Sequence, residues 1–511
     1  MTRRLSWTGL MVVAAALVVS TAAYLPMLVS GHLTRDSGVF LYTGTVISRG
    51  GMPYVDSWDH KGPLLAAIEA IAWRLGGGIA GAPILEGIMF FLGLAVAGLV
   101  WSRLIGRAAV PTVLVVGVTY LGVFEGGNFT ETWLFPLQLV AYSVVAHIVL
   151  RFGREASFRA VGFAGLLIGC ALTVGLFTRM NNVVGLVLVA ATGAIFFRRR
   201  LIFGGALLAV VGAVGAALSL WLWSGNALRA AVDQYLRYNL FYSGGASMGD
   251  RLSAFGTLAQ LLVSGAAVAA VLALTGAWLL RERTADGATG TRPLVVAVFI
   301  AVGGADALSQ MISGRPYPHY LVVAIAGFVV AGVVMLAHLL LESSSVSRWR
   351  GGRRNLPRWI AAGGVVLLVL ASSSTNALQW TRIALGAGVS VPGSYQAQLV
   401  DRVIAETSSN DRVLVHGAET WILAASERLS PTSITYSLPV EQGYDGLPAQ
   451  YLSDVVSFPP ALIVESPESC GISIECPPEE AHFEGLAPFV ASSYQLEGDI
   501  VGFRFWRRNA E

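Results

Sequence analysis

A single lysine, Lys61, stands among the 34 lysines and arginines of this 511-residue chain. It closes a polar segment that begins at Asp36 and contains Asp56, Asp59 and His60. A carboxylate within hydrogen-bond reach can take the proton of an attacking hydroxyl, and a fixed cation can stabilise charge that develops on a leaving phosphate. Held together at a membrane surface, these groups would suit the transfer of a group from a lipid phosphate.

Both end residues of this segment also have simpler explanations. Asp36 precedes a stretch with helical periodicity, 37–47, so it is either a helix N-cap or first-turn acid favoured by the helix dipole, or a general base. Lys61 is either a solvated loop lysine or interfacial anchor, or the cation that meets a phosphate. The spacing does not choose between these alternatives.

Composition predicts a membrane protein. The chain is 55% hydrophobic and 13% charged, with a mean hydropathy of +0.65, whereas a soluble domain carries about 25% charged residues. Apolar runs long enough to cross the hydrocarbon core recur, which predicts a polytopic α-helical membrane protein with about 11 transmembrane helices. The predicted spans are 7–29, 83–102, 108–124, 133–150, 160–178, 183–197, 202–223, 256–280, 293–313, 319–341 and 359–378.

Arginines in the connecting loops predict the orientation, because short cytoplasmic loops are rich in Lys and Arg. We expect a multi-pass protein of the plasma (inner) membrane, with the N-terminus cytoplasmic and 7–29 kept as a first membrane helix rather than a signal peptide. The segment 64–75 is too short to span and predicts a helix at the outer interface. The cytoplasmic clusters are then Arg103 and Arg107; Arg151, Arg154 and Arg159; Arg198, Arg199 and Arg200; Arg281, Arg283 and Arg292; and Arg348, Arg350, Arg353, Arg354 and Arg358.

This orientation gathers polar residues on the outer side. Acids and amides at span ends either cap helices or hold sugar hydroxyls, and basic or aromatic residues either anchor the chain at the interface or bind lipid phosphate. The candidates for sugar or acceptor binding are Tyr54, Asp56, Asp59, His60, Glu125, Asn128, Glu131 and Asn181. The candidates for binding donor phosphate are Lys61, Arg179, Arg315, His319 and Tyr320.

The chain divides into a membrane module, 1–378, with its outer loop at 30–82, and a tail, 379–511. In the tail the charge density rises and long apolar runs stop, which predicts a small extracytoplasmic α/β domain. Cys470 and Cys476 are either a local disulfide in an oxidising compartment or two free thiols. The predicted elements are strands at 413–416, 461–465 and 501–506 and a helix at 420–428 with Thr420 as a possible N-cap.

Several classes of function lack their signatures. The histidines are scattered, and no His-x-x-x-His or cysteine cluster predicts a transition metal. No Walker loop is present, and no basic patch with interleaved aromatics predicts nucleic-acid binding. No cofactor is therefore predicted, and a divalent cation has no sequence support.

The outer loop resembles the type C (GT-C) glycosyltransferase superfamily, especially the bacterial protein O-mannosyltransferase and aminoarabinose transferase branch, a family-39-like group. The likeness rests on an aspartate after the first span, on Gly-Gly-x-Pro-Tyr, and on Lys-x-Pro-Leu, and covers about residues 5–340. Ser37 replaces the glutamate that often follows the aspartate. His60 and Gly62 replace the glutamate and first proline of the branch's Glu-Lys-Pro-Pro-Leu segment. The Tyr-x-His-Tyr at 317–320 also recurs in bacterial relatives, near the lipid phosphate site.

The resemblance implies a periplasmic, inverting glycosyltransferase with a polyprenyl-phosphate sugar donor and a glycan, lipid or protein acceptor. Asp36 would then be the base, and Lys61 would contact donor phosphate. One alternative is a transporter or flippase of lipid-linked sugars, which predicts polar residues near mid-membrane in matched halves. Another is a scaffold whose tail binds partners, but a scaffold would not need so many ionisable groups in one loop.

Overall fold

The computed structural model describes residues 6–245, 247–264, 274–275, 291–346, 374–477, 483 and 485–510. These residues form two compact units, and both are assembled from separate stretches of chain. Helices α1 (Trp7–Ser30), α4 (Gly81–Ile105) and α9 (Arg200–Ser224) each contribute to both units. Unit 1 comprises Met1–Tyr24, Glu86–Ala217 and Ser243–Thr381, and unit 2 comprises Leu25–Leu85, Leu218–Tyr242 and Arg382–Glu511.

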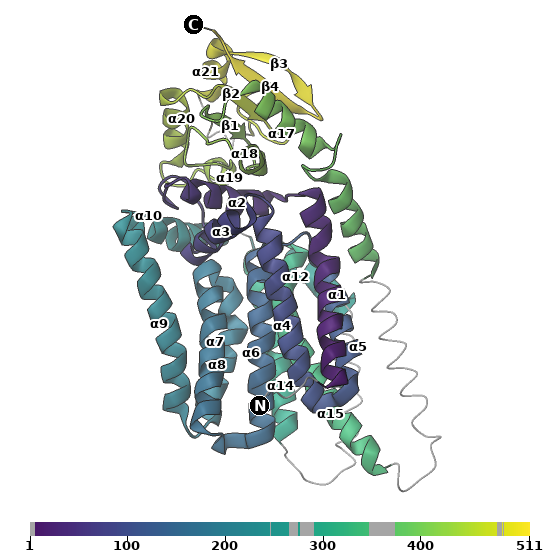
Figure 1. Cartoon of the computed structure of the whole chain (residues 1–511). Coiled ribbons are helices and arrows are strands. Elements are labelled where there is room, and N and C mark those ends of the chain that lie inside the picture. The colour runs from purple at the N-terminus through teal and green to yellow at the C-terminus, as the bar shows by residue number, and fades with distance from the viewer. Residues whose placement is uncertain are drawn as a thin grey trace. The chain divides into compact units, whose positions relative to one another are not determined.

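Unit 1 is a bundle of long apolar helices, several of which run alongside one another in Figure 1. Its central helix, α6, packs against α7 and α15, and α14 packs against α8 and α15. At the crossing of α14 and α15, a Cβ on Gly327 would lie 2.6 Å from the backbone nitrogen of Gly303, so only glycine lets these two backbones approach so closely. Besides its parts of α1, α4 and α9, the unit contains α5 (Ala109–Leu121), α6 (Thr130–Phe152), α7 (Phe158–Thr178), α8 (Val184–Phe196), α12 (Met248–Ser264), α14 (Thr291–Met311) and α15 (Val322–Val346).

Length and hydropathy confirm a polytopic helical membrane protein. The described residues contain seven helices long and apolar enough to cross a membrane, with α4 and α5 counted as one stretch, and α8 is a shorter apolar helix. Predicted spans that lie wholly within the described residues coincide with helices. The predicted spans 256–280 and 359–378 lie partly outside the described residues, and the arginines at 281–283 and 348–358 lie wholly outside them.

Unit 2 begins with two helices from the first loop, α2 (Arg35–Ser48) and α3 (Pro63–Gly76). Thr34 and Ser37 form a reciprocal capping box that starts α2, and Pro63 occupies the first turn of α3. A Cβ on Gly38 would lie 2.4 Å from the backbone nitrogen of Trp421, which begins α18 (Trp421–Ser426). The first loop therefore packs directly on the tail. The segment that follows α9 adds α10 (Leu228–Ala231), the π-helical turn η4 (Val232–Arg237) and α11 (Tyr238–Gly244).

The tail carries a four-stranded sheet, visible with its helices in Figure 1. Strand order is β1-β2-β4-β3, with β1 and β2 parallel and the other pairs antiparallel. The small α/β fold predicted for the tail is confirmed. The strands are β1 (Val413–His416), β2 (Leu462–Glu465), β3 (Tyr494–Ile500) and β4 (Phe503–Arg508), and the helices besides α18 are α17 (Tyr395–Glu406), α19 (Leu438–Glu441), α20 (Leu447–Ser457) and α21 (Leu486–Ser493).

Two details of the tail differ from the sequence prediction. The last strand begins at Phe503 because Val501, at φ +52°, and Gly502 form the turn after β3. Thr420 precedes α18, but its hydroxyl donates to the carbonyl of Thr435 at 2.8 Å instead of capping the helix. Cys470 and Cys476 form a disulfide, so of the two alternatives the bonded one holds.

Candidate functional site

The loop between α2 and α3 is held in shape by its own hydrogen bonds. Tyr54 has a positive φ of 68°, and its backbone N–H donates to the carbonyl of Ser57 at 2.8 Å. Its hydroxyl donates to the carbonyl of Lys61 at 2.7 Å. The Asp56 carboxylate accepts from the backbone N–H of Met52 at 2.7 Å. Tyr54 and Asp56, both predicted to bind sugar or acceptor, thus shape the loop that presents Lys61.

Three consecutive polar residues end this loop and face a tyrosine from the tail. Nζ of Lys61 lies 3.0 Å from Nε2 of His60, and Nδ1 of His60 lies 2.8 Å from the hydroxyl of Tyr436. Asp59 accepts the backbone N–H of Lys61 at 3.2 Å, and its Oδ1 lies 3.8 Å from Nδ1 of His60. We name Asp59, His60, Lys61 and Tyr436 the loop cluster.

Burial sets the proton affinity of the acid in this cluster. Burial raises the pKa of Asp59 to about 6, against an opposing effect of Lys61 and of the backbone N–H groups of Lys61 and His60. The negative charge of Asp36 adds to the rise. The loop is therefore an electrostatically coupled group of acids and bases, which is a common property of functional sites.

A segment far along the chain holds the loop backbone. Gln234 donates to the carbonyl of Tyr54 at 2.7 Å and accepts the backbone N–H of Asp59 at 3.1 Å. Asn239 donates to the carbonyl of His60 at 2.7 Å. Gln234 lies in the π-helical turn η4, and such turns recur at functional sites. No signal in the sequence had marked Gln234, Asn239 or Tyr436.

Asp36 is exposed in the first turn of α2, next to Arg35. Arg35 binds Glu419 and Glu468 of the tail, whereas the N-cap is Thr34. Asp36 is thus a first-turn acid that remains accessible from solvent. It also contributes to raising the pKa of Asp59 and of Tyr436, so it belongs to the electrostatic surroundings of the loop cluster.

A second group of predicted residues lies in unit 1, where α6 begins and α7 ends. Arg179, the C-cap of α7, forms an ion pair with Glu131 in the first turn of α6. The guanidinium also lies 3.9 Å from the centre of the Tyr320 ring, a cation–π contact. Although burial alone would lower the pKa of Arg179, Tyr320 and Glu131 raise it above its ordinary value. We name Glu131, Arg179 and Tyr320 the ion-pair cluster.

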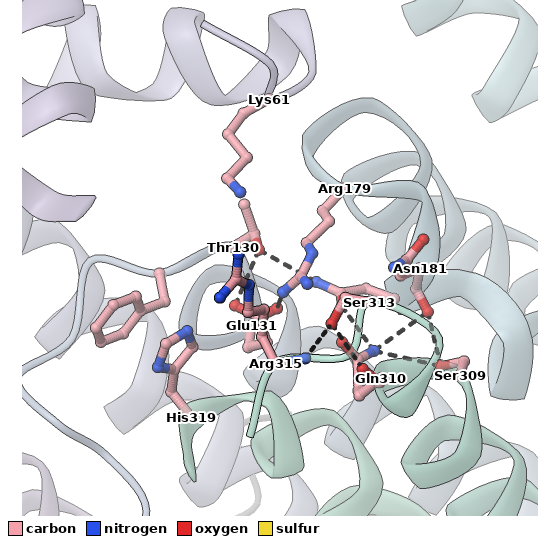
Figure 2. A network of polar contacts seen from close by, with 12 residues as sticks. Lys61, Thr130, Glu131, Arg179, Asn181, Ser309, Gln310, Ser313, Arg315 and His319 are labelled. Carbon is pink, nitrogen blue, oxygen red and sulfur yellow. Dashed lines mark hydrogen bonds and ion pairs between the residues drawn. The ribbon is translucent and has the colours of Figure 1, made fainter. Parts of the chain in front are cut away.

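Hydrogen bonds extend this cluster along three helix ends, as Figure 2 shows. Thr130 donates to Glu131 at 2.9 Å and accepts from Asn182 at 3.3 Å. Gln310 of α14 donates to the side chain of Asn182 at 3.1 Å and to the carbonyl of Asn181 at 3.2 Å. Asn181 therefore takes part through its backbone, and the polar residues inside α14 serve to fix the turn after α7.

The acidic turn before α6 has a separate arrangement. Glu125 accepts from the backbone N–H of His319 at 3.1 Å, and its carboxylate lies 2.7 Å from Nδ1 of that residue. The imidazole stacks on the ring of Phe129 at 3.9 Å between centroids. Asn128, at φ +52°, donates its backbone N–H to the buried Glu86 at 2.7 Å. Arg315 is exposed at the end of the turn that leads to His319.

The sequence-predicted residues thus form two groups, one in each unit. Unit 2 holds Asp36, Tyr54, Asp56, Asp59, His60 and Lys61, and unit 1 holds Glu125, Asn128, Glu131, Arg179, Asn181, Arg315, His319 and Tyr320. Among the described residues, no group of three or more His, Cys, Asp or Glu side chains is placed to hold a metal ion.

Comparison with known proteins finds solved structures that have a similar architecture. A crystal structure of ArnT from Cupriavidus metallidurans bound to undecaprenyl phosphate aligns over 99% of this chain and 99% of that chain, with a TM-score of 0.59 and 14% sequence identity. The chain has the fold of ArnT. A crystal structure of ArnT from the same organism in the apo state gives a TM-score of 0.58 over 97% of each chain at 15% identity.

Sequence comparison alone finds no such relative. No protein-family model matches the chain, and no curated protein matches it. The likeness to ArnT is one of fold, and it extends over the tail as well as the membrane helices. It confirms, at the level of fold, the resemblance to the aminoarabinose transferase branch that the short motifs of the first loop predicted.

Proposed function

We propose that this protein is a membrane glycosyltransferase that takes a sugar from a polyprenyl-phosphate donor. The observation that carries the proposal is the likeness in fold to ArnT over nearly the whole of both chains, one of them in a structure bound to undecaprenyl phosphate. The loop cluster supports it, because the sole lysine of the chain lies there among coupled acids and bases.

In the proposed reaction the acceptor hydroxyl attacks the anomeric carbon from the side opposite the phosphate. The new bond joins the acceptor oxygen to that carbon, the bond from the carbon to the phosphate oxygen breaks, and the configuration inverts. Asp36 takes the acceptor proton, and polyprenyl phosphate leaves with the bonding electron pair. An exposed first-turn carboxylate suits this role because an acceptor can reach it.

The other predicted residues take supporting roles in the proposal. Lys61 stabilises negative charge on the leaving phosphate, since a preorganised cation acts most strongly where charge develops. Arg179, Arg315, His319 and Tyr320 are also proposed to bind donor phosphate. Asp59, Asn128 and Glu131 are proposed for the sugar, and the acceptor is a glycan, lipid or protein of the cell envelope.

The test measures cleavage of a lipid-linked sugar. Purified protein in lipid nanodiscs is incubated with an extract of radiolabelled polyprenyl-phosphate sugars and cell-envelope acceptors, and released polyprenyl phosphate is quantified. The proposal expects release that depends on both the protein and an acceptor. A transporter of lipid-linked sugars would instead move the label across a proteoliposome membrane without releasing polyprenyl phosphate, and that result would overturn the proposal.

The proposal also fixes an orientation in the inner membrane, with the active site periplasmic. A reporter enzyme that is active only in the periplasm should be active when fused after Trp380. The same reporter inserted within 198–200 should be silent, because the arginines there predict a cytoplasmic loop. The reverse pattern would place the first loop and the tail in the cytoplasm and contradict the proposed site.

A further inference from the structure

The protonation of His60 follows from its two neighbours. An ammonium group has only donors, so Nζ of Lys61 must donate to Nε2 of His60, which lies 3.0 Å away. An imidazole that accepts at Nε2 carries its proton on Nδ1. That nitrogen lies 2.8 Å from the hydroxyl oxygen of Tyr436, which can accept the N–H. Asp59, 3.8 Å from Nδ1, also favours a proton on that side.

Contacts other than the hydrogen bond to His60 hold Tyr436 of the tail in place. Trp58 donates its backbone N–H to the carbonyl of Ser433 at 2.8 Å, which joins the loop to the segment that carries Tyr436. The rings of Trp58 and Tyr436 are 5.6 Å apart, and both side chains are buried. On the other side of the loop, Asn239 fixes the carbonyl of His60. These contacts place the ring of His60 beside Tyr436, and none of them involves Nδ1 of His60 or the hydroxyl of Tyr436.

We propose that Tyr436 is a positioning residue for Lys61, and that it acts by holding His60 in the tautomer whose Nε2 accepts from the ammonium. This inference deepens the proposed function and rests on it only where it assigns Lys61 to the donor phosphate. The hydrogen bond from Lys61 to Nε2 of His60 orients the ammonium, and this bond depends on the hydroxyl of Tyr436 at the other ring nitrogen. Without that hydroxyl, the proton can move to Nε2, where two donors would face each other.

Charged, aromatic and amide groups surround His60. Asp59 and Asp36 supply negative charge, Tyr238 and Tyr242 place their rings 5.5 and 6.0 Å from that of His60, and Asn239 reaches its carbonyl. The hydroxyl of Tyr238 donates to Gln442 at 2.8 Å. Tyr238 is therefore a matched control, a buried tyrosine of the same aromatic group whose hydroxyl has its own acceptor.

The experiment uses the fact that Lys61 is the sole lysine. Full-length protein in nanodiscs is treated with an amine-reactive acetylating reagent between pH 6.5 and 10, and the rate at Lys61 is read by mass spectrometry of its peptide. Only the neutral amine reacts, and an acceptor at Nε2 favours the ammonium. Tyr436→Phe should therefore raise the rate at pH 7.5 by about threefold to tenfold, as for a shift of half to one pKa unit. Tyr238→Phe should leave the rate unchanged.

A second variant separates the relay from simple packing. In His60→Gln the amide oxygen can accept from Lys61 without any help from Tyr436. In that background Tyr436→Phe should change the labelling rate by less than about 1.5-fold, since the coupling that a double-mutant cycle detects has been removed. An unchanged rate in Tyr436→Phe alone, or an equal rise in both backgrounds, overturns the relay.

The outcomes also distinguish failure of the relay from failure of the proposed function. Binding of undecaprenyl phosphate and transfer of the lipid-linked sugar are measured in parallel in the same nanodiscs for the parent, Tyr436→Phe and Lys61→Met. If labelling responds as expected but Lys61→Met binds and transfers like the parent, the relay stands and the phosphate role of Lys61 falls. If labelling does not respond while Lys61→Met loses transfer, the relay falls and the proposed function stands.

Discussion

In the ion-pair cluster the cation meets a carboxylate, and the side chains of Arg179 and Glu131 are only 12% and 1% exposed. In the loop cluster the ammonium of Lys61 meets a ring nitrogen of His60, and both residues are partly exposed. Arg179 is further covered by the ring of Tyr320, while the loop cluster is held mainly through its backbone by Gln234 and Asn239.

Because the two charges differ in burial, their removal should have different effects on the stability of the protein. Removing one member of a buried ion pair leaves the other charge without compensation, so its first consequence is a loss of stability. Charge at a partly exposed site can be removed with little effect on folding, because water remains available. We therefore expect removal of a charge from the ion-pair cluster to destabilise the protein, and removal of a charge in or near the loop cluster to affect transfer without destabilising the protein.

Asp36→Asn is the strongest test of the expectation for charges in and near the loop cluster. The side chain is exposed, so the melting temperature should stay within error of the parent. Turnover should fall by about two to four orders of magnitude, the usual contribution of a general base. Transfer assays on purified, folded protein provide the measurement, and near-normal turnover would remove Asp36 from the proposed mechanism.

The ion-pair cluster should give the opposite result. Arg179→Met removes the guanidinium from a buried carboxylate and should destabilise the protein by about 3–5 kcal/mol. Thermal unfolding in detergent is the measurement, followed by fluorescence. Combining Arg179→Met with Glu131→Gln should recover part of the loss, because the uncompensated charge is gone. A double variant no more stable than Arg179→Met would show that the arginine stabilises by packing alone.

Lys61→Met asks whether the loop cation acts in the transition state. The methionine keeps an apolar stem and removes the charge, so donor affinity should change less than turnover. The expected loss is on the order of 2–4 kcal/mol of barrier, as for removing one preorganised donor. Lys61→Arg should recover only part of it, since a planar fork does not replace a compact ammonium. Donor titration in nanodiscs separates affinity from turnover, and parental behaviour would leave Lys61 as an interfacial anchor.

The sequence predicted the elements better than their contacts. Apolar length defined the membrane helices, and a short alternating run placed β4 within two residues of its start. Those signals are local, because they depend on the periodicity of one segment. The pairing of Glu131 with Arg179 joins two span ends that topology placed on the same side, but only the packing of α6 on α7 brings them into contact.

Contacts with distant partners left no signal that the sequence could show. Tyr436 lies in an irregular stretch of the tail, and Gln234 and Asn239 lie between the predicted spans 202–223 and 256–280. Their contacts with His60 and Tyr54 join segments that are far apart in the sequence. The capping box of Thr34 and Ser37 also escaped the sequence analysis, because the usual signature has Glu or Gln at the third helical position and this chain has Ser37 there.

The smallest expected effect concerns the acid of the loop cluster and its dependence on pH. Because burial raises the pKa of Asp59 to about 6, from 3.8 for an ordinary aspartate, the folded protein holds this proton more tightly than the unfolded chain. The stability that the proton contributes is full below about pH 4 and is lost as the pH rises through about 6. A difference of about two pKa units between the folded and unfolded protein corresponds to at most about 3 kcal/mol of folding stability. Asp59→Asn cannot ionise and should keep this stability at pH 7.5.

The measurement is the melting temperature of the parent and of Asp59→Asn between pH 4.5 and 7.5. The variant should melt higher at pH 7.5, and the gap should shrink as the pH falls and Asp59 of the parent takes up its proton. Asp56→Asn, an exposed change in the same loop, serves as the control and should show no gap of this kind. A variant that melts lower than the parent at pH 7.5, with a gap that shrinks as the pH falls, would mean that the carboxylate of Asp59 is stabilised in the folded loop. Substitutions there would then act on folding first, as in the ion-pair cluster, and the contrast between the two clusters would fail.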